Sequence, residues 1–166
     1  IGNFNSRNFN SKMEQLNEYL HGKMEDLRGS WISKNSGYEN DLCIILGFNC
    51  QKERYWDCEY NDLYIEIKKG KSIWLDEVRY SEIFMGINDK CKQKTITIFL
   101  IPSKDKNKIE NIIIVDSQKL IDYLKIDAKS AEFLLTRREI INRTLNCQQS
   151  VSLKDLKSMA DYIVSS

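Results

Sequence analysis

The sequence predicts a mixed α/β domain in which a central mixed β-sheet is flanked by helices. Alternation of apolar and polar residues over Leu63–Lys69 has the period of a half-buried strand. Two further runs, Thr95–Ile101 and Asn111–Val115, are rich in β-branched residues and indicate two neighbouring strands. Helical patterns precede and follow these strands, which is the arrangement of a sheet covered by helices.

The first expected element is an amphipathic helix over residues 11–28, with Ser11 as its cap and Glu14 three residues later. Its apolar residues recur at helical spacing and form one stripe, made of Met13, Leu16, Leu20, Met24 and Leu27. The stripe fits either the core of the domain or a dimer surface. A second helix is expected over Gly37–Phe48, ending near Gly47.

A β-hairpin is expected next, because two strand-like segments flank a short turn. Glu53–Glu59 would pair with Leu63–Lys69 through a two-residue turn at Asn61-Asp62. Asn and Asp both tolerate the left-handed backbone that such a turn requires. A shift of one residue would turn each side chain to the other face, so the register decides which residues meet.

The predicted register places Asp57 directly opposite Glu66, with Lys68 one step along on the same face. Opposed carboxylates have Cβ atoms about 5 Å apart and repel each other. Such a pair needs a counter-ion, for which a divalent cation is the obvious choice, and the lysine is a ready partner for a water molecule there. Three other acids are rivals for the place of Asp57 if the register slips or the turn differs: Glu53, Glu59 and Asp62.

The remaining elements follow the hairpin in order. Leu75–Met85 reads as a loop with a short helix, and Ser103–Glu110 is a polar connection between the two apolar strands. Three helices are expected after the second of these strands: Ser117–Leu124 capped by Ser117, Ala128–Leu145, and Ser152–Val164 capped by a serine.

The composition indicates one globular domain over residues 1–166. Of the 166 residues, 42% are apolar and 30% are charged, which is ordinary for a folded protein. No apolar run reaches membrane-spanning length, and the five cysteines are odd in number without a CxxC pair, so we expect a cytoplasmic protein with reduced thiols. A single histidine makes histidine-based metal or triad chemistry unfavourable. Acidic residues exceed basic ones over residues 51–90 and the reverse holds over 91–130, which suits a metal-dependent enzyme acting on a polyanion.

The residues Trp56-Asp57 and Glu66-Ile67-Lys68 resemble the motif of the PD-(D/E)xK nuclease superfamily, with Trp56 where proline is common. The order of the flanking elements is also similar to that of small type II restriction endonucleases. An acidic residue, Glu39, lies on the helix before the hairpin, and a strand, a second strand and a short helix follow it. The topological match covers residues 36–125, so that 1–35 would be a possible dimerisation helix and 126–166 helices that contact DNA.

The resemblance implies Mg²⁺-dependent, sequence-specific hydrolysis of double-stranded DNA by a homodimer, with Mn²⁺ able to replace Mg²⁺. Asp57 and Glu66 would be metal ligands together with the main-chain carbonyl of Ile67, and Glu39 would contribute to a second metal through water. Lys68 would hold or deprotonate the attacking water. A host of such an enzyme must also carry a DNA methyltransferase that protects its own sites.

Contacts to DNA are expected at two segments and at several basic residues. The stretch after the motif and the polar segment 146–150 are candidates for reading bases, and five basic residues are candidates for phosphate contacts. The candidate base-reading residues are Arg79, Tyr80, Ser81, Asn146, Gln148 and Gln149. The candidate phosphate contacts are Lys69, Lys71, Arg137, Arg138 and Arg143. Two other functions remain open: a structure-specific nuclease such as a Holliday junction resolvase or repair nuclease, and an inactive DNA-binding or protein-interaction module with the same fold.

Overall fold

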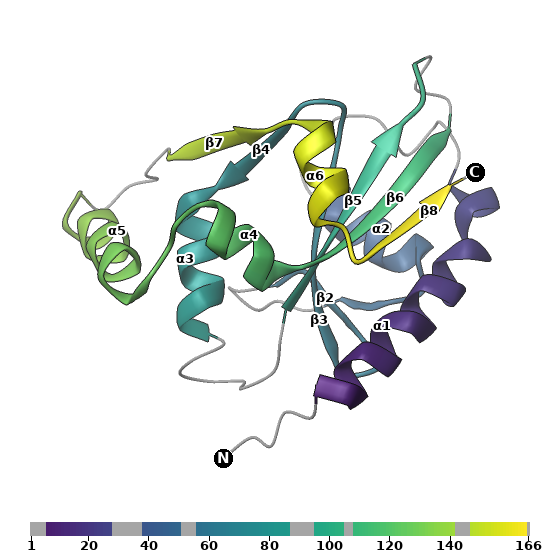
Figure 1. Ribbon diagram of the computed structural model, residues 1–166, viewed down its shortest axis with the longest axis horizontal. Helices are drawn as coiled ribbons and strands as arrows, with labels where there is room; N and C mark the ends of the chain where they lie inside the picture. Colours follow the sequence, from purple (N-terminus) through teal and green to yellow (C-terminus); the bar gives the residue numbers. More distant parts are fainter. Residues whose placement is uncertain are drawn as a thin grey trace.

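The computed structural model describes residues 6–27, 38–50, 56–86, 95–104, 108–141 and 147–165, apart from the side chains at 6–7, 38–40, 86 and 141. Within these residues the chain is a mixed α/β fold with helices on both faces of a central mixed sheet (Figure 1). The described helices are α1 (Ser6–His21), the 3₁₀ turn η1 (Met24–Asp26), α2 (Tyr38–Ile45), α3 (Glu77–Gly86), α4 (Ser117–Tyr123), α5 (Ala128–Ile141) and α6 (Leu153–Met159). The described strands are β1 (Asn49–Cys50), β2 (Cys58–Tyr60), β3 (Leu63–Lys69), β4 (Ile73–Asp76), β5 (Thr95–Pro102), β6 (Ile109–Asp116), β7 (Gln148–Val151) and β8 (Tyr162–Ser165).

The described strands form a six-stranded sheet and a separate two-stranded ribbon. The order in the large sheet is β1-β2-β3-β5-β6-β8, and β4 pairs with β7 in the ribbon. Strands β3 and β5 are parallel, and the other recorded pairs are antiparallel. A parallel pair requires a long crossover, and here β4 and α3 lie within it. The crossover therefore brings α3 over the face of β3.

The β2–β3 hairpin has the predicted turn and register. Asn61 and Asp62 both have left-handed backbone, with φ of 50° and 62°, as a two-residue turn between twisted strands requires. The recorded pairs, Tyr60 with Leu63 through Cys58 with Ile65, are those that the sequence predicts. Residues 51–55 lie outside the described residues, so the proposed partner strand is seen only from its C-terminal part.

Alternation along β3 sends its side chains into two different cores. Ile65 and Ile67 pack on the side of α1 and α2. The opposite face of the neighbouring strand β5 presents Phe99 to the core formed with α3 and α4. Because parallel neighbours in register share a face, Glu66 and Lys68 lie on this second side, beside Thr97 and Phe99. Burial of the apolar face of β3 against α1 and α2 therefore turns Glu66 and Lys68 toward α3.

The apolar stripe of α1 lies in the core of this chain. Phe9, Met13, Leu16 and Leu20 are buried against the sheet, and Leu27 joins them after the helix has ended. The stripe therefore cannot also be a dimer surface, and that part of the sequence interpretation is wrong. The helix begins at Ser6 instead of Ser11.

Two features of the C-terminal part also differ from the prediction. The N-cap of α4 is Asp116, whose Oδ1 accepts a hydrogen bond from the Gln118 amide, while Ser117 is buried. The last predicted helix is capped by Ser152 as expected, but it ends at Met159 and the chain continues as β8, which pairs with β6. Pairing of four residues of β8 with β6, which buries Val164 in the core, accounts for this change.

Among the described residues, no helix has the length and apolar character needed to cross a bilayer.

Candidate active site

The central strand β3 places one acid and one lysine on the face that α3 covers. Glu66 is only 4% exposed, whereas Lys68 is partly exposed. Hydrophobic neighbours on both sides hold the strand in place, since Ile65 and Ile67 are fully buried in the opposite core. A carboxylate inside a strand of the main sheet is costly unless something compensates its charge. This makes Glu66 the residue whose surroundings need an explanation.

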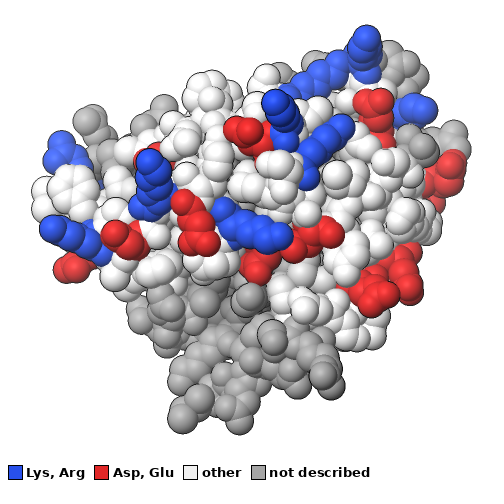
Figure 2. All heavy atoms as spheres, in the orientation of Figure 1, with Lys and Arg blue, Asp and Glu red and all other residues white. Residues whose placement is uncertain are grey.

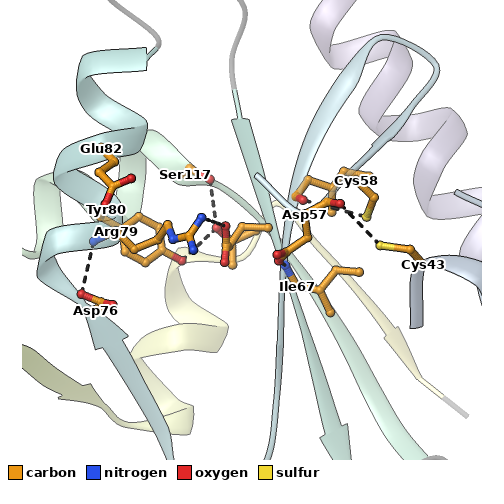
Figure 3. A network of polar contacts seen from close by, with 12 residues as sticks. Cys43, Asp57, Cys58, Ile67, Asp76, Arg79, Tyr80, Glu82 and Ser117 are labelled. Atoms are coloured by element: carbon orange, nitrogen blue, oxygen red, sulfur yellow. Dashed lines mark hydrogen bonds and ion pairs between the residues drawn. The ribbon is translucent and has the colours of Figure 1, made fainter. Parts of the chain in front are cut away.

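Asp57 reaches the same region by leaving the strand ladder. Continuing the recorded register by one residue would place it opposite Glu66. Its amide instead donates to the Ile65 carbonyl (2.9 Å), and its Oδ2 accepts a hydrogen bond from the Ile67 amide (2.8 Å). The side chain of Asp57 therefore replaces a main-chain carbonyl in the pairing with β3 (Figure 3). The predicted proximity of the two acids is present, but through a side-chain contact and not a continued ladder.

The two acids influence each other strongly. Burial first, and the charge of Asp57 second, raise the pKa of Glu66 to about 8 from an ordinary value of 4.5. A side-chain hydrogen bond with Asp57 also raises this pKa, while the charges of Arg79 and Lys68 lower it. The Oε2 atom of Glu66 is buried and has no hydrogen-bond partner among the described residues. Shifted pKa values cluster at functional sites, and a buried polar atom without a partner is rare in folded proteins, so this carboxyl group is a candidate for a functional role.

Arg79 is the counter-ion that the sequence argument did not identify. It extends from α3 toward the sheet (Figure 3). Its Nη1 lies 4.0 Å from Oε2 of Glu66. Burial lowers the pKa of Arg79, but Glu66, Glu82, Asp57 and Asp76 together raise it above its ordinary value. Part of the charge of the acidic pair is thus offset by this chain itself. Arg79 was predicted to read guanine, but in this structure it faces the acidic pair.

Asp76 begins α3 and fixes the direction in which Arg79 leaves the helix. Its Oδ1 accepts hydrogen bonds from the amides of Val78 (2.9 Å) and Arg79 (3.2 Å), as a capping side chain does. One turn further along, Glu82 pairs with Arg138 of α5. Both residues of this second pair are largely buried, so Arg138, predicted to contact phosphate, is instead occupied between two helices.

Two predicted DNA-reading residues are buried. Tyr80 is fully buried, and its hydroxyl shares a hydrogen bond with Oγ1 of Thr97 (3.0 Å), which in turn contacts Oγ of Ser117 (2.9 Å). Ser81 is also fully buried and donates to the Glu77 carbonyl (2.7 Å). Their predicted DNA contacts are therefore wrong in this structure. The reason is that both residues lie on parts of α3 that pack against the rest of the domain, Tyr80 against Thr97 of the sheet, which the sequence pattern did not show.

The first part of the stretch after the motif pairs with the second predicted base-reading segment in the β4–β7 ribbon, whereas Arg79, Tyr80 and Ser81 lie on α3. Trp74 pairs with Ser150, and Asp76 pairs with Gln148. Ile73 and Leu75 are buried, so the alternate residue Trp74 points outward and is 54% exposed. Three residues of β7 are also exposed: Gln148, Gln149 and Ser150. The polar segment at 146–150, predicted to lie between two helices, is a strand from Gln148 onward.

The other predicted residues are placed as follows. Lys69 is partly exposed at the end of β3, and Lys71 is exposed and donates to the Lys104 carbonyl (3.0 Å). Arg137 is exposed on α5. Glu39 lies in α2, before the hairpin as expected, but its side chain is outside the described residues, as are Asn146 and Arg143. On the face in Figure 2, basic and acidic side chains are interspersed, in agreement with a net charge of +1.

The acidic pair can be judged as a metal site from its donors. Among the described residues, no three or more His, Cys, Asp or Glu side chains gather where they could hold a metal ion. Two carboxyl groups that converge, one of them with an unsatisfied buried oxygen, nevertheless fit a hard cation that keeps several waters. Comparison of the chain with protein-family models, curated proteins and solved structures found no match to any of them.

Proposed function

We propose that this chain is a Mg²⁺-dependent, sequence-specific endonuclease of double-stranded DNA, similar to type II restriction enzymes with the PD-(D/E)xK motif. One observation supports this most. The buried Glu66, with its unsatisfied Oε2, lies beside Asp57 and shares a face of β3 with Lys68. A purely structural strand has no need of such an arrangement.

Asp57 and Glu66 would hold the ion, with the Ile67 carbonyl, and Mn²⁺ could take the place of Mg²⁺. Oxygen ligands from carboxylates and carbonyls suit these hard cations. When bound, the ion supplies positive charge that polarises the scissile phosphate and favours ionisation of a nearby water. Glu39, on the helix before the hairpin, is a further acid that would contribute to a second metal ion through a water molecule.

Lys68 would position the attacking water and stabilise the charge that develops on the phosphate. Its ammonium group has three donors and no acceptor, so it can contact a water and a phosphate oxygen together. The side chain is partly exposed, whereas its neighbour on the same face, Glu66, is buried. The lysine can therefore reach a substrate at the surface while the acid remains beneath it.

The β4–β7 ribbon would read the DNA sequence. A two-stranded ribbon fits the width of the major groove, and glutamine side chains can pair with adenine edges. Gln148 and Ser150 are exposed on β7, next to Asp76 and Trp74 of β4. In the sequence, Lys69 and Lys71 lie between Glu66 and strand β4 of this ribbon. Phosphate contacts there would fix the register of the duplex.

A homodimer is proposed because one small domain carries one site, whereas a duplex has two strands to cut. With the α1 stripe buried, the second copy would dock on α5, where Phe133 is 62% and Ile140 is 77% exposed. They line an open hollow of about 560 Å³ together with Lys129, Glu132, Thr136 and Arg137. Phe133 and Ile140 lie two turns apart and form an apolar stripe on α5, with Glu132 and Arg137 on its opposite flanks. Two α5 helices side by side and parallel about a two-fold axis would therefore bring each glutamate to the partner's Arg137.

The test is cleavage of plasmid and phage DNA by the purified protein with MgCl₂. Discrete fragments are expected from the wild type. In the variants Asp57→Asn, Glu66→Gln and Lys68→Gln the cleavage rate should fall by at least about 100-fold. Asp57→Asn keeps an acceptor for the Ile67 amide, so folding should persist. Asp62→Asn is the matched control, since it removes a hairpin charge at an exposed turn position. A Lys68→Gln protein that cuts at the normal rate would contradict the mechanism.

One observation favours a second candidate, a nuclease-fold DNA-binding module without activity. Arg79 already offsets part of the charge of the acidic pair, as a permanent structural ion pair would. Titration calorimetry with MnCl₂ separates the two, because the inactive module would bind no ion at this pair. Preference for four-way junctions over linear duplex in the cleavage assay would instead indicate a structure-specific nuclease.

A further inference from the structure

We propose that Arg79 is a displaceable counter-ion of the acidic pair, which a divalent cation must drive away before it can bind. This inference rests on the proposed function, and it concerns how the same site is controlled. It gives Arg79 a role in metal binding in place of the predicted contact with guanine. Three observations on the described residues support it.

The first observation is that the contact between Arg79 and Glu66 is loose. The 4.0 Å between Nη1 and Oε2 exceeds the length of a hydrogen bond, and Oε2 has no other hydrogen-bond partner among the described residues. A buried structural pair is normally hydrogen-bonded on its polar atoms, because an unsatisfied oxygen is costly. The pair of Glu82 and Arg138, in direct contact nearby, shows that this fold can form a tight buried pair. The arginine therefore compensates charge at the acidic pair without using up the ligand atom.

The second observation is that Arg79 has other acidic neighbours. Glu82 follows it by three residues on α3, the spacing at which side chains of a helix meet, although Glu82 also pairs with Arg138. Asp76 caps the start of the same helix, and both acids act on Arg79 in this structure. A rotation of the long side chain toward Asp76, or toward Glu82 shared with Arg138, would thus keep the guanidinium compensated.

The third observation is that the Arg79 side chain is partly exposed to water. The Arg79 side chain is 33% exposed, compared with 5% for that of Glu66. Figure 3 shows Arg79 extending from α3 toward the strands of the large sheet, while Glu82 lies back along the helix. A cation held by Asp57 and Glu66 would lie within a few ångströms of this positive charge, and the two would repel each other. Binding of the ion and departure of the arginine are therefore coupled.

The experiment is titration calorimetry with MnCl₂ in the absence of DNA, on the wild type and three variants. Arg79→Gln should bind Mn²⁺ about tenfold more tightly than the wild type, because the competing charge is gone. Arg79→Lys keeps a positive charge and should remain near the wild type. Lys154→Gln, which removes an exposed positive charge on α6, controls for the change in net charge.

A second readout follows the arginine directly. The ¹⁵Nε signal of Arg79 should shift during titration of the wild type with MgCl₂, with the midpoint that calorimetry repeated with MgCl₂ gives. Equal or weaker Mn²⁺ binding by Arg79→Gln, or an Nε signal that stays fixed while the ion binds, would overturn the inference and leave the proposed function intact. If neither the wild type nor Arg79→Gln binds an ion at millimolar concentration, the proposed function itself fails.

Discussion

Glu66 joins two properties that a strand residue rarely has together, since it is buried and it is acidic. With the pKa raised to about 8, the folded chain holds this proton more tightly than the unfolded chain, where the carboxyl titrates near 4.5. The favourable contribution is complete below pH 4.5 and is lost as the pH rises through 8. Above that pH, the charges of Arg79 and Lys68 offset part of the buried negative charge.

We therefore expect Glu66→Gln to stabilise the metal-free protein at high pH. Relative to the wild type, its free energy of unfolding in EDTA should be similar at pH 4.5 and greater at pH 9, by on the order of 4 kcal/mol. Urea unfolding of both proteins at several pH values measures this difference, with Glu18→Gln on the exposed face of α1 as a control. If the free energies of unfolding of Glu66→Gln and the wild type change with pH in the same way, the pKa of Glu66 is not raised in the folded protein.

The sequence predicted the acidic pair but not its counter-ion, for a physical reason. Asp57, Glu66 and Lys68 are joined by one hairpin, and local turn chemistry at Asn61 and Asp62 decides their register. Arg79 comes from a helix inside the crossover between two parallel strands, so its position depends on how that helix packs. Periodicity identifies the helix, but it does not show which face the sheet covers.

At the scale of elements, the β4–β7 ribbon shows the same limit. Each strand has only four residues, and they are separated by more than 70 positions in the chain. Short strands with distant partners leave little periodic signal in either segment. Both segments had been selected for polar side chains suited to base contacts, but their pairing is a property of the folded chain. The conversion of the expected last helix into β8 has a similar cause, because pairing with β6 decides it.

Because the ribbon and the acidic pair lie on different elements, we expect a substitution in the ribbon to change base recognition without changing the hydrolytic site. Gln148→Ala should reduce discrimination at one base pair of the recognition site by about 1–3 kcal/mol and leave the acidic pair unchanged, because the amide contacts base edges. Cleavage rates on duplexes with single substitutions in the recognition site measure this effect. Lys154→Ala, on a neighbouring exposed helix, is the control. If Gln148→Ala keeps its full discrimination, the outward face of the ribbon does not read that base.

At the scale of the whole molecule, the buried α1 stripe determines where a second copy can dock. The core on the α1 side already contains the apolar residues that sequence analysis offered for a dimer. Phe133 and Ile140 are instead exposed on the far side of the chain, on the helix that packs against α3. Because α3 carries Arg79 and its neighbour Glu82 pairs with Arg138 of α5, a dimer built on α5 would adjoin the elements that support the acidic pair.

We predict that Phe133→Glu and Ile140→Glu abolish the dimer and leave the fold intact, because each places a charge in the centre of the apolar stripe. Sedimentation equilibrium should show a monomer for both variants and a dimer for the wild type. Ile44→Glu is the matched control, since Ile44 is 64% exposed on α2, away from this stripe. The monomers should nick one strand of supercoiled plasmid more often than they cut both, because a single site faces a single strand. A Phe133→Glu protein that still sediments as a dimer would place the interface elsewhere.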